Sequence, residues 1–153
     1  MFTNSNFHFF AQVKFIPETI PVFSQVTSLT LTFIRHPKFS MLKMISILSA
    51  FPCLCTFELM TRCPEDVDEE KAKPVEYVPR HLTKVELGGF CSTPNQMEFA
   101  IYLLKNASAL RWLVIEQEVK PYVPKRQSWD EGEREMVYER LQEFAKDGVL
   151  VVR

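Results

Sequence analysis

Two stretches of the chain, LTKVEL at residues 82–87 and LRWLVI at residues 110–115, decide the fold because they repeat one pattern. The pattern is apolar-x-x-apolar-x-apolar. It occurs in phase twice more, at residues 26–31 and 54–59, each copy 28 residues after the one before. In each copy the last two apolar residues are two apart, so a strand points both of them to the same side.

One strand cannot bury that side alone, whereas parallel copies stacked side by side can bury it together. The period of 28 residues lies within the range of leucine-rich repeats. The fold class is therefore predicted to be α/β: a short leucine-rich-repeat-like solenoid of parallel strands, with helices and loops on the outer wall. The pattern also places Leu29, Phe57, Val85 and Leu113 on neighbouring rungs of one interior.

The first two connectors differ in character. Residues 41–48 carry apolar side chains at helical spacing, with Ser40 as a possible cap and Pro52 as the stop. Residues 62–79 are acidic, contain prolines and have no helical period, so they are predicted to form a loop. Gly88 and Gly89 are expected to release the chain from the third strand.

Two further helices are predicted from capping signals. Thr93, Pro94 and Gln96 form a capping box with proline at the first helical position, and the helix is expected to end near Asn106. A charged amphipathic helix follows Ser128, is expected to end at Gly148, and precedes a closing strand at residues 149–152. We expect this last helix and strand to cap the stack.

The 153 residues suffice for one domain with a real core. Five of the 13 phenylalanines fall within residues 1–15, and this cluster must be buried within the fold or against a partner. An apolar edge near residues 26–33 is where it could lie.

Composition excludes several classes of partner. The net charge of −1 gives no reason to expect nucleic acid or an anionic membrane. No segment is long and apolar enough to span a bilayer, and residues 1–15 lack the basic start of a signal peptide. A cytoplasmic or nuclear protein with four reduced cysteines is therefore expected.

The sequence shows no catalytic or cofactor motif. Cys53, Cys55 and Cys63 match no common zinc spacing, and the three histidines are isolated. Glu135 and Glu139 are more typical of a charged helix surface than of a glycosidase pair. We therefore expect no enzyme activity, no metal and no cofactor.

The alternate positions of the strands are the candidate binding residues, because they point away from the shared interior. Trp112 stands out as a possible binding anchor, with burial under the long loops or the last helix as an equal alternative. The predicted partner-binding residues are Thr30, Glu58, Lys84, Glu86, Trp112 and Glu116.

Residues 79–115 resemble the FBD module at the C-terminal end of plant F-box/leucine-rich-repeat proteins. The resemblance rests on the strands at 82–87 and 110–115, the Gly89-Phe90 pair, the Glu98-bearing helix and, most specifically, Leu103-Leu104-Lys105-Asn106-Ala107. It divides the chain into a Phe-rich segment (1–24), two leucine-rich-repeat-like units with an acidic loop at 62–78 (25–78), and an FBD-like region with its capping helix and strand (79–153).

In that family an F-box recruits the adaptor and cullin of a ubiquitin ligase, while the repeats hold the target. Residues 1–24 show no F-box-like helical period, so the resemblance implies a target-binding part without the recruiting part. Association with a ligase does not follow from it. The leading hypothesis is a non-catalytic module that binds a protein partner. The alternative is a truncated structural fragment of a larger F-box/leucine-rich-repeat protein, with no partner-binding role of its own.

Overall fold

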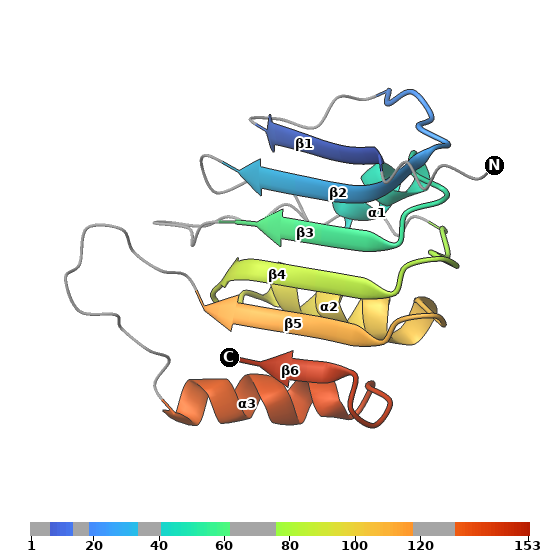
Figure 1. The fold of residues 1–153 in the computed structure, drawn as a ribbon. Coiled ribbons are helices and arrows are strands. Elements are labelled where there is room, and N and C mark those ends of the chain that lie inside the picture. The colour runs from blue at the N-terminus through green and yellow to red at the C-terminus, as the bar shows by residue number, and fades with distance from the viewer. Residues whose placement is uncertain (1–6, 14–18, 34–40, 62–75, 118–130) are drawn as a thin grey trace.

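The computed structural model describes residues 7–13, 19–33, 41–61, 76–117 and 131–153 (Figure 1). Its elements are β1 (Phe7–Val13), β2 (Val26–Phe33), α1 (Lys43–Ser49), β3 (Thr56–Met60), β4 (Lys84–Phe90), α2 (Pro94–Asn106), β5 (Trp112–Gln117), α3 (Glu131–Gln142) and β6 (Leu150–Val152).

The described strands form one six-stranded sheet in which every neighbouring pair is parallel and the order follows the sequence from β1 to β6. The register carries the 28-residue period. Leu29 pairs with Phe57, Phe57 with Val85, and Val85 with Leu113. The predicted neighbouring rungs are confirmed, and the fold is an α/β structure with a parallel sheet.

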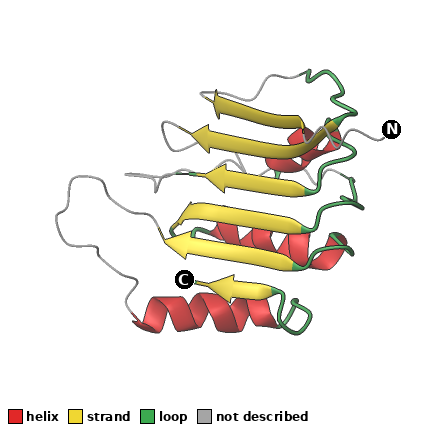
Figure 2. Ribbon diagram, in the orientation of Figure 1, coloured by secondary structure: helices red, strands yellow, loops and turns green. Residues whose placement is uncertain are grey.

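One face of this sheet is covered by helices. Figures 1 and 2 show α1 and α2 on the same side of the strands, with α3 running beside β6. Leu29, Phe57, Val85 and Leu113 point to the covered side and have no exposed surface. Full burial of a side chain of this size contributes about 1.5–3 kcal/mol, so each residue of this layer adds to the stability of the fold.

The helix α2 follows the predicted capping signals but buries a partly different set of side chains. The Thr93 side chain accepts from the backbone N–H of Gln96, and the Gln96 side chain completes the capping box. The sequence predicts one apolar stripe of Met97, Ala100, Ile101, Leu104 and Ala107. Met97, Ala100 and Ala107 are buried as expected, whereas Phe99 and Leu103 are buried in place of Ile101 and Leu104.

Three helix ends differ from expectation. The helix α1 begins after Leu42 without a side-chain cap, and the proposed cap Ser40 lies outside the described residues. Asn106 does not adopt a left-handed conformation; its Nδ2 donates to the Tyr102 carbonyl at 2.9 Å. The helix α3 ends at Gln142 rather than at Gly148, which adopts φ 76° just before β6.

The junction between β3, β4 and α2 is tied by buried polar groups. Gly88 and Gly89 lie inside β4 instead of after it. Gln96, 2% exposed, donates from Nε2 to Thr61 Oγ1 at 3.2 Å and to the Gly89 carbonyl at 3.3 Å, while its Oε1 accepts from the Cys91 N–H at 2.8 Å. These bonds satisfy buried groups that would otherwise cost about 1–3 kcal/mol each.

Part of the phenylalanine-rich start forms the strand β1. This strand pairs with β2 and covers the edge that the four repeated strands leave open.

The expectation of four reduced thiols is wrong for Cys91, which is disulfide-bonded. Cys53 and Cys55 are free. Sequence spacing reveals nothing of this disulfide, since a pairing depends on which segments the fold brings together.

Candidate functional site

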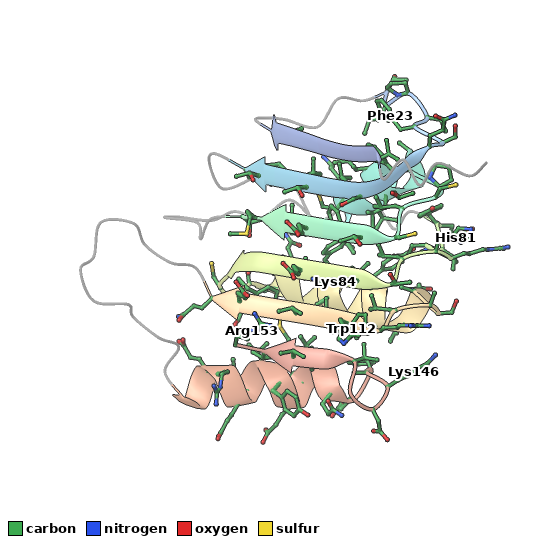
Figure 3. All side chains as sticks on the ribbon, viewed as in Figure 1. Phe23, His81, Lys84, Trp112, Lys146 and Arg153 are labelled. Carbon is green, nitrogen blue, oxygen red and sulfur yellow. The ribbon has the colours of Figure 1, made fainter. Side chains whose placement is uncertain are left out.

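The face of the sheet opposite α1 and α2 is the candidate site, and we refer to it as the open face. Its alternate strand positions point away from the core, and Figure 3 shows Lys84 on β4, Trp112 at the start of β5 and Arg153 just after β6. The open face comprises the outward positions Ser28, Thr30, Thr32, Thr56, Glu58, Met60, Lys84, Glu86, Gly88, Trp112, Val114, Glu116, Val151 and Arg153.

One row of register partners on the open face runs across the sheet, and its side chains change from polar on β2 to apolar on β5. Thr30 pairs in register with Glu58, Glu58 with Glu86, and Glu86 with Val114. The Thr30 hydroxyl donates to Glu58 Oε2 at 3.3 Å, and Thr30 is only 9% exposed. Thr30 therefore offers a partner less accessible surface than the other predicted residues do.

Val114 lies in this row but is buried, with 5% exposure. Its register neighbours are Glu86 and Val151, and Trp112 and Glu116 flank it on its own strand. These four neighbours lie on the same side of the sheet and surround it. The open face is thus packed locally around one valine even though no helix of the described residues lies over it (Figure 2).

The next row brings Trp112 beside a charged pair. Lys84 is the register partner of Trp112, and its Nζ lies 2.9 Å from Glu86 Oε1. Trp112 is 48% exposed. Of the two alternatives for this residue, the exposed one agrees with the structure. A half-exposed indole on a sheet face presents a large rigid apolar surface that a partner could cover.

The charges of the open face act on one another. The side-chain hydrogen bond and the negative charge of Glu86 raise the pKa of Lys84, and the charge of Glu58 raises it further. Arg153 opposes this by lowering the pKa of Lys84. Three charged side chains, from β3, β4 and the end of β6, therefore act on Lys84 and form one electrostatic cluster with it.

Glu116 and Arg153 close the row nearest the C-terminus. Arg153 Nη1 lies 3.3 Å from Glu116 Oε1, and the Arg153 N–H donates to the Ile115 carbonyl at 2.9 Å. Sequence reasoning missed Arg153. The signal was present in the closing strand, because parallel pairing of Val151 with Val114 places residue 153 beside residue 116.

Met60 supplies a second exposed apolar side chain. It is 47% exposed and lies beside Gly88 on β4, where a Cβ would overlap the Met60 sulfur. Gly88 was expected only to release the chain from the strand. In the fold the missing side chain of Gly88 leaves room for the end of the Met60 side chain.

All six predicted partner-binding residues lie on the open face. The structure brings Thr30 together with Glu58, and Lys84 with Glu86, while Trp112 stands beside Lys84 and Glu116 lies apart with Arg153. Their role in binding stays a prediction. Within the described residues no group of three or more potential metal ligands occurs, and none of the helices there is long and apolar enough to cross a membrane.

The fold and the open face together define the class of this protein. It is an α/β protein whose parallel sheet has one side covered by helices and one open side that carries charges of both signs. Comparison with known families adds the particular domain. Residues 69–115 match the family model FBD, a span that includes β4, α2 and the first residues of β5. This segment of the chain is therefore similar to an FBD domain. Neither the curated proteins nor the solved structures contain a match to the chain.

Proposed function

We propose that this chain is a non-catalytic protein-interaction module that holds its partner on the open face. The role resembles that of the target-binding part of F-box ubiquitin-ligase subunits. In this proposal the repeated units form a short leucine-rich-repeat-like solenoid that presents the open face to the partner. The observation that carries the proposal is Trp112, a 48% exposed tryptophan on the face that α1 and α2 leave uncovered.

Energetic reasons favour this surface over others. Tryptophan is enriched among residues that dominate binding energy, provided that charged or polar neighbours frame it. Lys84 and Glu86 provide such a frame on the adjacent strand. The FBD match supports the same role at the level of the domain, because the matched segment contains all three residues.

The test combines affinity purification with a double substitution. Tagged chain carrying Trp112→Ala and Glu86→Gln should capture less of the partner set than the unchanged chain. The matched control is Tyr138→Ala with Glu135→Gln, since Tyr138 is 43% exposed and both residues lie on α3. A captured protein should then be purified and titrated against each variant. Equal partner sets and equal affinities in both double variants would contradict the proposal.

A second candidate is a structural fragment that caps a larger solenoid and binds no partner of its own. It is favoured by the ending of the sheet, where the three-residue β6 lies beside the highly charged helix α3. Purified residues 1–153 discriminate between the two. A monomer that melts cooperatively supports the self-sufficient module, whereas aggregation or a molten state supports the fragment.

A further inference from the structure

The end of the sheet where the strands begin carries a group of cations. Because the strands are parallel and sequential, the loops that lead into β4, β5 and β6 lie side by side at one edge. Figure 3 shows His81, Trp112 and Lys146 at this end of the molecule. We refer to Arg80, His81, Arg111 and Lys146 as the basic edge.

Backbone hydrogen bonds fix these loops next to one another. The Arg111 N–H donates to the Thr83 carbonyl at 2.8 Å, which ties the start of β5 to the start of β4. The Leu113 N–H donates to the Val149 carbonyl at 2.8 Å, which ties β6 to β5 in the same way. The basic edge is therefore held by the sheet and does not depend on the conformation of long side chains alone.

The three permanent cations of the basic edge differ from the cations of the open face. Lys84 and Arg153 are neutralised by Glu86 and Glu116. Arg80, Arg111 and Lys146 are exposed and form no ion pair within the described part of the chain. Asp147 is the acidic neighbour of Lys146 in sequence. The basic edge thus retains a surplus of positive charge in a chain whose net charge is −1.

Trp112 joins this charge to an apolar surface. It directly follows Arg111 and is the register partner of Lys84, so its exposed indole lies where the basic edge meets the open face. Guanidinium groups bind carboxylates in a planar, bidentate geometry, and an indole accepts an apolar side chain. Cations arranged beside such an anchor match a peptide that carries acidic residues around one apolar residue.

We propose that the basic edge binds an acidic segment of the protein partner, with carboxylates at Arg80, Arg111 and Lys146 and an apolar side chain against Trp112. This rests on the proposed function and specifies the chemistry of the partner. A peptide is favoured over nucleic acid because the free cations are few, Asp147 follows Lys146 in the chain, and Glu86 lies on the adjoining open face. Nucleic-acid binding draws on a longer run of phosphate contacts.

The experiment uses the full chain and a defined probe. The probe is a short fluorescein-labelled peptide of alternating Glu and Ser with one central Leu, and its control replaces every Glu by Gln. Fluorescence anisotropy at low salt should show binding of the Glu peptide and at least about tenfold weaker binding of the Gln peptide. Added salt should weaken the binding, because the contacts are exposed.

Substitutions then locate the binding site. Arg80→Gln with Arg111→Gln should weaken binding of the Glu peptide by about tenfold or more, and Arg111→Gln alone by a smaller factor. Arg134→Gln is the matched control, since Arg134 is an exposed arginine on α3 outside the basic edge. These substitutions are on the surface, so circular dichroism should show an unchanged fold.

Three results would overturn the inference: equal binding of the Glu and Gln peptides, equal binding by the Arg80/Arg111 variant, or tighter binding of single-stranded RNA or phosphatidylserine vesicles through the same arginines. The proposed function fails separately. If the Trp112/Glu86 variant loses its partner while the unchanged chain ignores the Glu peptide, the open face binds and the acidic chemistry is wrong.

Discussion

The two faces of the sheet are built from the same strands yet follow different rules. On the covered face the register positions repeat, with Leu29, Phe57, Val85 and Leu113 all apolar and fully buried. On the open face the register positions do not repeat, since Thr30, Glu58, Glu86 and Val114 share no chemistry.

The contrast separates architecture from recognition. A buried layer needs an apolar side chain of fitting size at every rung, so the period is kept. The open face needs only side chains that a strand tolerates, so each rung can differ without loss of the fold. A surface whose residues vary while its backbone is held fixed is suited to recognition, and this is where the structure places Trp112 and its charged neighbours.

Leu113→Ala is the largest expected disruption of the covered face. Leu113 is fully buried between Val85 and Leu150 of the neighbouring strands. Truncation leaves a cavity in a layer shared by adjacent units and should lower the free energy of unfolding by about 2–5 kcal/mol. Urea denaturation followed by circular dichroism measures this change. A loss below about 1 kcal/mol would mean that the covered face does not act as one packed layer.

A substitution at Gly89, near the end of β4, tests how closely the backbones of β3 and β4 approach each other there. Gly89 adopts φ 70°, and a Cβ at this position would overlap the carbonyl oxygen of Thr61. Gly148 adopts a similar φ of 76°, but a Cβ there would meet no atom within 4 Å. Gly89→Ala should therefore destabilise by more than about 2 kcal/mol, and Gly148→Ala by only about 1 kcal/mol.

The two alanine variants share the cost of a positive φ, so the difference between them measures the contact with Thr61 alone. Equal unfolding free energies would show that β3 and β4 can separate at this end to admit the methyl group. Melting temperatures of the two variants, compared with the unchanged chain, provide the same comparison with less material.

Sequence reasoning reached the parts of the fold that depend on local or periodic signals. The four repeated strands and their register follow from the period of 28, and the capping box at Thr93 follows from adjacent residues. It could not reach features decided by tertiary neighbours. The burial of Phe99 in place of Ile101 and the strand formed by residues 7–13 depend on which surfaces meet after the chain has folded.

The candidate site was predictable to a similar extent. Alternation along each strand placed Lys84, Glu86 and Trp112 outward, and the ion pair between the first two is a consequence of their spacing on one strand. The burial of Val114 was not predictable, because it depends on four neighbours from three strands. The basic edge joins Arg80, Arg111 and Lys146, which only the order of strands brings together.

Trp112→Ala has the smallest expected effect on stability, and it compares the two faces of the sheet within a single strand. Trp112 and Leu113 are adjacent in sequence, yet one is 48% exposed and the other is fully buried. Trp112→Ala should lower the unfolding free energy by less than about 1 kcal/mol, because half of the indole already lies in water and only the other half packs beside Val114. Measured in the same urea titration as Leu113→Ala, it should leave the midpoint nearly unchanged while partner binding falls. A loss above about 1.5 kcal/mol would instead assign the indole to packing over Val114 and Lys84, and the weaker binding would then be a result of unfolding.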